Sequence, residues 1–552
     1  KRSQTQIQTQ TTTTKTTMTT KMTTTVKLNT LFAHPTPIQL VRHLTEKTRV
    51  SSETNKMSVL ELNTEAESVL DLEFHDIPPH SHVPDTPTPT PTTTPTPRPS
   101  STNASCTTPS PPRKKTILLT GGTGFLGAYL VRDLMSTSWS RDEDGVDVDV
   151  VCVVRAASNE AAKERVLKNL DKYGLSLQTQ AASGSASLTC VCGDVTLPKF
   201  GLAKDVYDKL AQRVTSVYHC ASMVHYAHSY ETMKTANVIG TAHVLRFCIE
   251  GGTLKSLHYI STLGVYPVTQ FNREEINESS IIDTHGFVAT GYSQSKFVAD
   301  ALVRKFVERY PQRLNHVCLY RPARIVGDDN TGKGADDFLF KLLHLCLRVY
   351  CYPNDIVWDV DVTSVNSLSE CIARLSTTPT SQDNNTNNNN LTTASCATIY
   401  HLHNQATQPF VAVCAWLSGR AVDKGVLQAP MESVPWSEWI RRCEMLLTSD
   451  TDTDDTVSDA LKAFIPVLSS TACEFQDHVP FPLSAKSIRC TATATALALT
   501  HVRTHAQTHT QTHAQTRIQT NNQTNNQTIG QTNKQTNERT NKPTNNQSIN
   551  QS

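Results

Sequence analysis

The sequence lacks any run of about 18 apolar residues, the length that a helix needs to cross a bilayer. Its Thr-rich N-terminus also lacks the apolar core of a signal peptide. Charge of one sign is not in excess either, because 51 Lys and Arg face 50 Asp and Glu for a net charge of +1. These absences argue against a membrane span and against a nucleic-acid-binding surface. We therefore expect a cytoplasmic protein whose partner is neither a membrane nor a nucleic acid.

Paired CxxC motifs are absent as well, although the chain contains 15 cysteines. Structural zinc sites need such spacing, so we expect free thiols in a reducing compartment and no metal site. Four histidines recur every four residues near the C-terminus, but the Thr and Asn residues around them oppose the helix that would align their rings. These histidines are His501, His505, His509 and His513.

Low-complexity stretches divide the chain. Residues 1–25 are rich in Thr, residues 79–114 in Pro, Thr and Ser, residues 381–394 in Asn, and residues 488–552 run into a short polar repeat. Such stretches carry too few apolar side chains to offset the entropy lost on ordering. Because only 38% of all residues are hydrophobic, we expect these stretches to be disordered and residues 115–487 to form the folded part.

Short β-branched runs alternate with amphipathic stretches inside that folded part. The alternation predicts an α/β fold, a Rossmann-type doubly wound parallel sheet with helices on both faces, over residues 115–330. A smaller, mostly helical substrate lobe is expected over residues 331–487. The predicted strands are Thr116–Thr120, Val148–Val154, Leu188–Cys192, Ser216–Cys220, Ser256–Ile260 and His316–Tyr320.

The first predicted strand runs into TGGTGFLG, residues 120–127, which opens a helix. Gly121 permits a tight turn, Gly124 lets the backbone approach a pyrophosphate, and Gly127 lets the helix pack against the strand. Amides at the start of the helix would face the anion. The pattern predicts a dinucleotide site, although on its own it is equally typical of a packing turn.

Charged residues at the ends of the next strands favour the nucleotide interpretation. Arg155 ends the second strand, where a site that prefers NAD has an acid; a guanidinium instead suits the 2′-phosphate of NADPH, which is therefore the predicted cofactor. Arg165, on the next predicted helix, either adds a second charge or lies on a solvated helix face. Asp194, after the third strand, either accepts a hydrogen bond from the adenine amino group or is an ordinary loop aspartate.

A catalytic group follows the fifth strand. Thr262 ends "YIST", and Tyr292 and Lys296 lie one helical turn apart in "GYSQSKFVADALV", which places an ammonium near a phenol and favours its ionised form. Tyr292 can then exchange a proton with a carbonyl oxygen that Thr262 holds by a hydrogen bond, and Lys296 would also bind the nicotinamide ribose. We predict these three residues to be catalytic.

The order of these motifs, TGGTGFLG, GD, ST and YxxxK, resembles that of the extended short-chain dehydrogenase/reductases. "CVVRAASNEAAKERVLKNLDKYGL", "LHYISTLGV" and "YRPARIVGDDNTGKGADDFLF" are also similar to the thioester reductase domains that end certain nonribosomal peptide synthetases, α-aminoadipate reductases and carboxylic acid reductases. The resemblance runs from about residue 115 to 450. It extends the expected cofactor site to Thr120, Thr123, Phe125, Leu126 and Ala221.

An upstream stretch, "VKLNTLFAHPTPIQLVRHLTE" within residues 26–48, resembles the last helical segment of a phosphopantetheine carrier domain. Residues 49–114 contain "AESVLDLEFHDIP", which is similar to the usual connector, followed by the Pro-rich linker. Thr-rich sequence stands where the Ser that bears the prosthetic arm would be, so the carrier is expected to be truncated. The resemblance implies a carrier domain as partner, in cis or in trans, and NADPH-dependent reductive release of its acyl or aminoacyl thioester as an aldehyde.

Two alternatives stay open. A fatty acyl-CoA reductase would use the same three catalytic residues, although the carrier-like stretch argues against it. A non-catalytic, dinucleotide-sensing scaffold would be expected to lose Tyr292 or Lys296, and both are present.

Residues outside the catalytic group carry smaller expectations. Asn237 resembles the family's position on the central helix, or bonds backbone inside the fold. Asp336 is expected to cap a helix of the lobe that lines the acyl tunnel, with Phe338 and Phe340 in the core. Trp436 and Trp439 are expected to pack inside the lobe.

Overall fold

The structure is a computed structural model. It describes residues 57–78, 114–136, 147–177, 186–225, 228–267, 275–288, 290–335, 337–377 and 397–447, together with Gln270, Ile465, Leu468, Cys490 and Thr493. The Thr-rich segment 1–25, the carrier-like segment 26–48, the Pro-rich stretch, the Asn-rich loop 381–394 and the histidine repeat lie outside the described residues.

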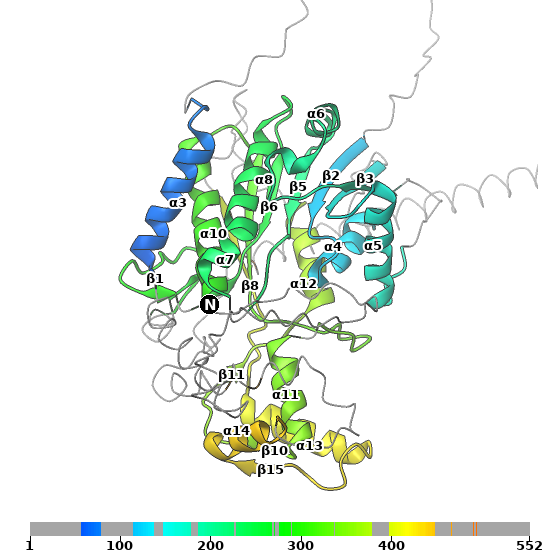
Figure 1. The fold of residues 1–552 in the computed structure, drawn as a ribbon, viewed down its shortest axis with the longest axis vertical. Helices are drawn as coiled ribbons and strands as arrows, with labels where there is room; N and C mark the ends of the chain where they lie inside the picture. Colours follow the sequence, from blue (N-terminus) through cyan, green and yellow to red (C-terminus); the bar gives the residue numbers. More distant parts are fainter. Residues whose placement is uncertain are drawn as a thin grey trace, which may run out of the picture.

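A seven-stranded parallel sheet forms the centre of the fold, with the strand order β13-β8-β6-β5-β2-β3-β4 (Figure 1). The predicted Rossmann-type sheet is therefore confirmed, and each of the predicted strands lies in it. β13 was not predicted. The strands are β2 (Lys114–Thr120), β3 (Asp147–Val154), β4 (Ala186–Cys192), β5 (Ser216–His219), β6 (Ser256–Ile260), β8 (His316–Pro322) and β13 (Thr398–Leu402).

Helices cover both faces of the sheet, each with its own apolar cluster. One face carries α4 (Phe125–Met135), α5 (Asn159–Lys172) and α12 (Val365–Leu375). The other carries α6 (Lys204–Arg213), α7 (Tyr230–Lys234), α8 (Gly240–Ile249) and α10 (Gly291–Arg309). A π-helical turn, Thr235–Ile239, joins α7 to α8, and short 3₁₀ turns occupy Pro198–Gly201 and Leu263–Val265.

The strand order reverses between β2 and β5, which lie side by side with Thr120 opposite His219. In an open parallel sheet, the crevice for a ligand forms at the carboxyl ends of the strands at such a point. The glycine turn follows β2 there, and the catalytic candidates follow β6 on the same edge.

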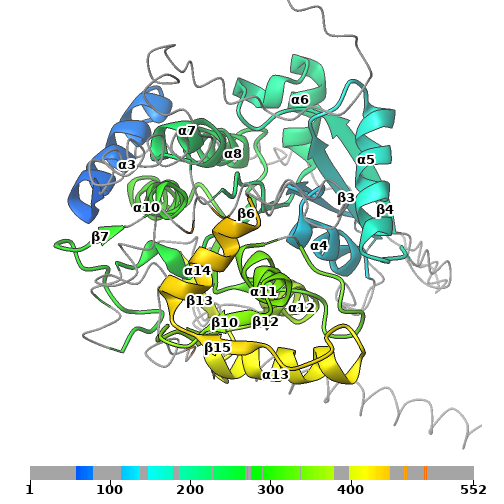
Figure 2. The same cartoon turned by 60° about the horizontal axis from the view of Figure 1, so that its bottom comes forward.

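A second, smaller lobe has its own apolar core and lies below the sheet in Figure 1. Its helices are α11 (Phe338–Arg348), α13 (Phe410–Asp423) and α14 (Trp436–Met445). Two strand pairs join them: β10 (Cys351–Pro353) with β15 (Glu432–Val434), and β11 (Asp359–Val360) with β14 (Gln408–Pro409). Figure 2 shows α11, α13 and α14 together on this side of the molecule.

The boundary predicted at residue 330 is too simple. After the first part of the lobe the chain returns, because β12 (Thr363–Ser364) pairs with β9 (Ile325–Val326), α12 packs on α4, and β13 adds to the sheet beside β8. The apolar residues of α12 and β13 belong to the core of the sheet and not to that of the lobe.

A helix that was not predicted lies in the connector. α3 (Val59–Phe74) follows a two-residue strand, β1 (Met57–Ser58), which pairs with β7 (Phe287–Val288). Ser58 and Glu61 form a capping box at its start. One face of α3, including Leu62, Leu70 and Phe74, is buried in the core that also contains α10, so this part of the connector belongs to the domain that contains the sheet.

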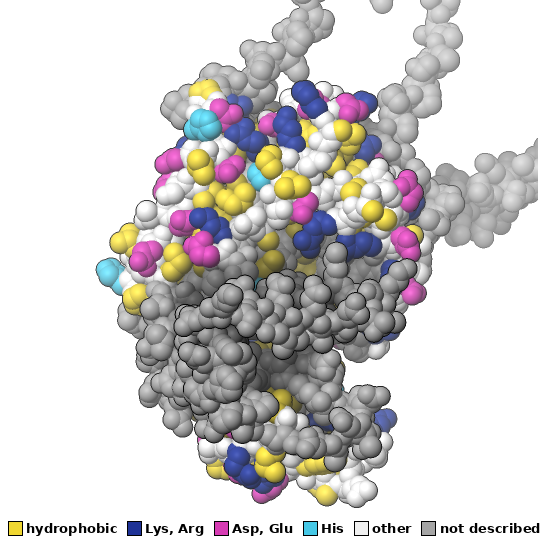
Figure 3. Space-filling view, viewed as in Figure 1, with side chains coloured by type: hydrophobic (Ala, Val, Ile, Leu, Met, Phe, Trp, Pro, Cys, Tyr) yellow, Lys and Arg dark blue, Asp and Glu magenta, His cyan; other side chains and the backbone are white. Residues whose placement is uncertain are grey.

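Charges of both signs are interspersed on the face drawn in Figure 3. Within the described residues, no helix has the length and apolar character needed to cross a membrane.

Candidate active site

The glycine turn has the geometry that its sequence predicted. Gly121 has a φ of +82°, and Gly124 N donates to Gly121 O at 2.9 Å. A Cβ added to Gly121 would lie 2.6 Å from the amide nitrogen of Ala221, and one added to Gly127 would overlap Gly121 O. The turn therefore needs glycine at both positions, and Ala221, at the end of β5, lies directly against it.

Helix α4 begins at Phe125 with Gly124 as its N-cap, and no side chain caps it. Gly124 is exposed and Leu126 is buried. Backbone N–H groups of the first turn thus keep the capacity to bind an anion. An uncapped helix start behind a turn that only glycine can make fits the pyrophosphate of a dinucleotide, with Thr123 and Phe125 at its edge.

Thr120 has an internal role in the structure. Its buried hydroxyl contacts His219 Nδ1 at 2.7 Å and accepts from Ala221 N at 3.2 Å, and His219 Nε2 contacts Thr241 at 3.0 Å. Burial lowers the pKa of His219 to about 3, so its ring is neutral at ordinary pH. Thr120 therefore fastens β2 to β5 beneath the turn.

Sequence reasoning missed Asn169. Its side-chain amide, on α5, donates to the carbonyl oxygens of Gly122 at 3.2 Å and Gly124 at 2.9 Å. This contact pins the glycine turn from the neighbouring helix. No motif within the sequence signals it, because the two segments meet only through the packing of α5 beside α4.

Arg155 and Arg165 come together at the end of β3. Both side chains are exposed, and the Arg165 guanidinium donates to the Arg155 backbone carbonyl. Asp194 lies beyond the adjacent β4, where its Oδ1 accepts from both the amide and the hydroxyl of Thr196 at 2.9 Å. One oxygen of Asp194 therefore stabilises its own loop, as expected for an ordinary loop aspartate. The carboxylate as a whole remains partly exposed.

Tyr292 and Lys296 lie in the first two turns of α10, which Thr290 caps at Ser293 N. Lys296 is 2% exposed; its Nζ donates to the Ile260 carbonyl at 2.6 Å and lies 4.3 Å from the centre of the Tyr259 ring. Burial lowers the pKa of Lys296 to about 8. The buried lysine is therefore tied to the end of β6, and Tyr292 stays partly exposed.

Thr262 is the first residue of the turn after β6. Its Oγ1 accepts from Gly264 N at 3.1 Å, which leaves its own proton to donate. A Cβ on Gly264 would lie 3.0 Å from Ser293 Oγ, so this turn packs against the start of α10. The structure thus brings the Thr262 turn, Tyr292 and Lys296 to one edge of the sheet.

Asn237 forms hydrogen bonds to the backbone inside the fold, which is one of the two roles expected for it. Its amide donates to Met223 O at 3.0 Å and to Ser295 Oγ at 2.9 Å, and its Oδ1 accepts from Met223 N at 2.7 Å. It lies in the π-helical turn and holds the loop after β5 against α10.

In the lobe, the helix cap is Asp337 and not Asp336, which lies outside the described residues; Asp337 Oδ1 accepts from Phe340 N at 2.8 Å. Phe338 packs against the apolar cluster of the lobe, but Phe340 is 56% exposed, so its placement in the core was wrong: it lies in the first turn of α11, on the face away from that cluster. Trp436 and Trp439 are buried and pack together, as predicted.

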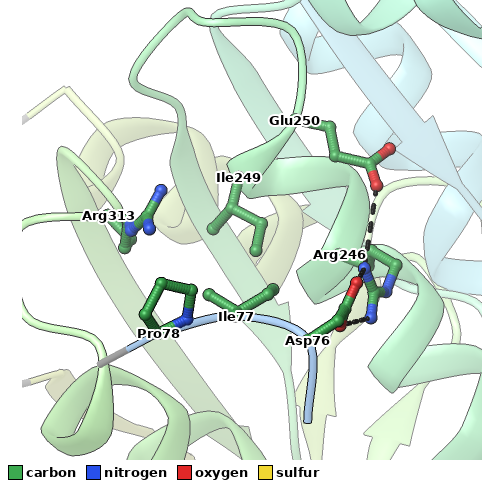
Figure 4. Close-up of a pocket in the computed structure, with 7 residues that line it drawn as sticks. All are labelled: Asp76, Ile77, Pro78, Arg246, Ile249, Glu250 and Arg313. Atoms are coloured by element: carbon green, nitrogen blue, oxygen red, sulfur yellow. Dashed lines mark hydrogen bonds and ion pairs between the residues drawn. The ribbon is translucent and has the colours of Figure 1, made fainter. Parts of the chain in front are cut away.

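A pocket of about 290 Å³ lies away from this site, between the end of α3 and the end of α8 (Figure 4). Two of its lining residues, Arg246 and Asp76, form an ion pair, and none of its lining residues is a predicted site residue. Among the described residues, no cluster of His, Cys, Asp or Glu could hold a metal ion.

Comparison with known proteins gives one family and a consistent set of relatives. The family model described as "Male sterility protein", an NAD-binding model, matches residues 119–372. The non-canonical nonribosomal peptide synthetase FrzA of Cladobotryum is 30% identical over 336 residues, which cover 59% of this chain and 29% of that protein. The L-2-aminoadipate reductase large subunit of Penicillium chrysogenum is 32% identical over 251 residues, 43% of this chain and 17% of that one.

Among solved structures, the terminal R domain from the myxalamid PKS-NRPS pathway is 27% identical, with a TM-score of 0.55, and the match covers 70% of this chain and 87% of that one. The chain spans less than a third of the length of either curated relative. The matched region is therefore one domain of those larger proteins.

Proposed function

We propose that this chain contains a terminal reductase domain of the extended short-chain dehydrogenase/reductase superfamily that uses a nicotinamide dinucleotide, and that it releases a carrier-bound acyl or aminoacyl group by reducing the thioester to an aldehyde. The matching family model, the similar peptide synthetases and the similar R domain support this proposal. The observation that carries the proposal is the meeting of Thr262, Tyr292 and Lys296 at the same sheet edge as the glycine turn.

The glycine turn and the start of α4 would hold the pyrophosphate, and Lys296 the nicotinamide ribose. When bound, the nicotinamide supplies a hydride to the carbonyl carbon of the thioester. Negative charge then develops on the carbonyl oxygen, where the Thr262 hydroxyl donates a hydrogen bond and Tyr292 delivers a proton. The carbon–sulfur bond of the resulting hemithioacetal breaks, and aldehyde and free thiol leave.

Lys296 acts through its charge. A buried ammonium one helical turn from Tyr292 would stabilise the phenolate that remains after proton transfer. Its bond to the Ile260 carbonyl holds the ammonium at the end of the strand that also carries Thr262. The proton donor Tyr292 and the cation Lys296 therefore lie on one helix, and the hydrogen-bond donor Thr262 lies at the end of one strand.

NADPH is the proposed form of the cofactor. Arg155 and Arg165 together offer two exposed guanidinium groups at the end of β3, where a 2′-phosphate would lie. At the end of β3, the chain has Arg155 where a site for NADH would have an acid.

A carrier domain bearing the acyl phosphopantetheine is the proposed partner. The relatives named as peptide synthetases support this partner, and the carrier-like stretch at residues 26–48 agrees with it. These relatives do not favour the fatty acyl-CoA reductase alternative, and the presence of Tyr292 and Lys296 argues against a silent scaffold.

The deciding experiment follows NADPH consumption by the full chain with acyl-pantetheine thioesters, the matching CoA esters and the free acids, and traps the aldehyde. Turnover on pantetheine thioesters with stoichiometric aldehyde supports the proposal. Faster turnover on long acyl-CoA esters would favour the alternative enzyme. Tight NADPH binding without turnover on any thioester, including a carrier-loaded one, would contradict enzymatic function.

A further inference from the structure

Two members of a row of residues on α10 form hydrogen bonds with two consecutive residues at the end of β6. Tyr292, Lys296 and Asp300 follow one another at intervals of one helical turn. Opposite them, the Ile260 carbonyl accepts from Lys296 at 2.6 Å, and Ser261 Oγ donates to Asp300 Oδ2 at 2.6 Å. The next residue along the strand end is Thr262. Two adjacent hydrogen bonds therefore set the position of Thr262 along the catalytic helix.

Asp300 is completely buried and pairs with an equally buried cation on β8. Arg321 donates to both carboxylate oxygens, from Nε at 3.0 Å and from Nη2 at 2.8 Å, and it donates from Nη1 to the Tyr266 hydroxyl at 2.7 Å. Both side chains are about 1% exposed. Arg321 follows Tyr320, whose carbonyl accepts from Ser261 N at 2.7 Å. The pair thus joins α10, β6 and β8 behind the catalytic residues.

The geometry points to Asp300 and Arg321 as positioning residues of the active site: together they fix the Ile260–Thr262 strand end against α10, and Asp300 keeps a fixed negative charge one turn from Lys296. This inference rests on the proposed function only for its activity readout. A buried pair of this kind is weak evidence for stability, because desolvation offsets most of the attraction, so a role in alignment and charge is the better account of it.

Three groups on the strands beside Lys296 are neutral near pH 7. On β5, burial lowers the pKa of His219 to about 3 and raises that of Cys220 to about 12. On β6, burial raises the pKa of Tyr259 well above its ordinary value. Tyr292 is the remaining group, on α10 itself. Of the groups named here, Asp300 alone brings an anion to Lys296.

Arg321 keeps that anion ionised. Burial by itself would raise the pKa of Asp300, but the paired guanidinium, with Arg304 and the Ser261 hydroxyl, holds it well below the ordinary value. The Asp300 charge in turn opposes the desolvation that lowers the pKa of Lys296. Loss of the Asp300 charge should therefore let Lys296 lose its proton at a lower pH.

The test compares Asp300→Asn, which removes the charge, with Asp300→Glu, which keeps it. Arg304→Gln is the control, because Arg304 also contacts Asp300 at 3.0 Å but is 28% exposed and leaves the buried pair intact. For each full-length variant we would measure the pH profile of kcat, the Kd for NADPH, and the titration of Lys296 in nucleotide-free protein labelled at lysine ¹³Cε.

Asp300→Asn should lower kcat roughly tenfold or more and move both the alkaline limb and the Lys296 titration about one pH unit downward, while Asp300→Glu and Arg304→Gln keep both near wild type. If the Asp300→Asn variant folds and keeps both the wild-type kcat and the wild-type alkaline limb of the pH profile, the inference is overturned. If that variant does not fold, Asp300→Asn/Arg321→Gln removes both charges and retains polar groups at both positions. Should this double variant also fail to fold, the pair is a stabilising element only, and the inference is wrong.

The Lys296 titration needs no substrate. A shift of that titration in a protein with no turnover on any thioester would support the charge role of Asp300 while the proposed function fails. An unshifted Lys296 titration in an active enzyme would contradict the charge role of Asp300 and leave the proposed function standing.

Discussion

Gly127 lies so close to Gly121 that a methyl group on Gly127 would overlap the Gly121 carbonyl oxygen. The helix that would receive the cofactor phosphates can therefore begin where it does only because both positions lack a side chain.

Gly127→Ala should distort the turn, lower the free energy of unfolding by about 1–3 kcal/mol or more, and weaken NADPH binding. Gly419→Ala is the matched control, since Gly419 lies within α13 and no atom approaches its missing Cβ within 4 Å. It should gain up to about 1 kcal/mol from helix propensity. Urea unfolding measures the stability of each variant, and NADPH titration measures its affinity for the nucleotide. Unchanged NADPH affinity in Gly127→Ala would argue against a phosphate site at this turn.

Tyr292→Phe should lower kcat on a pantetheine thioester by roughly 10²–10⁴-fold, because it removes the proton donor and leaves the ring in place. The Kd for NADPH should stay within about twofold, since the phenol is not part of the proposed phosphate site. Tyr350→Phe, at a position that is 65% exposed in the lobe, should behave as wild type. A Tyr292→Phe enzyme that turns over at the wild-type rate would remove Tyr292 from the mechanism.

Arg155→Ala should raise the KM for NADPH about 10–100-fold and leave the KM for NADH nearly unchanged, because a charge-assisted contact to the 2′-phosphate is worth about 1.5–3 kcal/mol. Arg420→Ala, which removes an exposed arginine from α13, is the control for net charge. Initial rates with both nucleotides give the ratio. An equal loss with NADPH and NADH would mean that Arg155 does not read the 2′-phosphate.

The sheet was predictable because its strands are β-branched runs that end in recognisable turns. β13 escaped prediction because Thr398–Leu402 is short and follows the Asn-rich stretch, and its place beside β8 is set by long-range pairing. The lobe could not be bounded for the same reason. α3 did carry a local signal, Ser58 followed by Glu61 before an apolar run, but the resemblance of the segment to a connector implies no helix.

The site was predictable in its motif residues and not in its supporting residues. Ser261 and Thr262 are adjacent and chemically alike, yet the structure commits Ser261 to Asp300 and leaves the proton of Thr262 to donate. Side chains that alternate along an extended segment take different surroundings, so the two hydroxyls have different partners. Asn169 and Arg321 act from elements that only tertiary packing brings to the site, so no local pattern announces them.

Helix α3 packs on α10, so we predict that it contributes to the stability of the folded domain. Phe74 is 1% exposed, its ring centre lies 4.9 Å from that of Phe306 on α10, and Glu67 pairs with Lys305 and Arg309 of the same helix. Phe74→Ala should cost about 3–5 kcal/mol of unfolding free energy. Leu72→Ala, on the same helix at a position that is 69% exposed, should change it by less than about 0.5 kcal/mol. Equal, small effects would show that α3 contributes nothing to the stability of the catalytic helix.

Burial lowers the pKa of Lys296 from 10.5 to about 8, so between these pH values the folded protein binds fewer protons than the unfolded chain. The free energy of unfolding contributed by this residue must then rise with pH across that window, by roughly 3 kcal/mol, and be constant below and above it.

Other groups titrate in the same window, so the quantity to measure is the stability of the nucleotide-free wild type minus that of Lys296→Met, by urea unfolding from pH 7 to 11. The difference should rise between about pH 8 and 10.5, because the variant has no proton to exchange at this position. A flat difference for Lys296→Met would mean that the ammonium is as well solvated in the fold as in the unfolded chain, and the cation proposed to support Tyr292 would then not be a desolvated one.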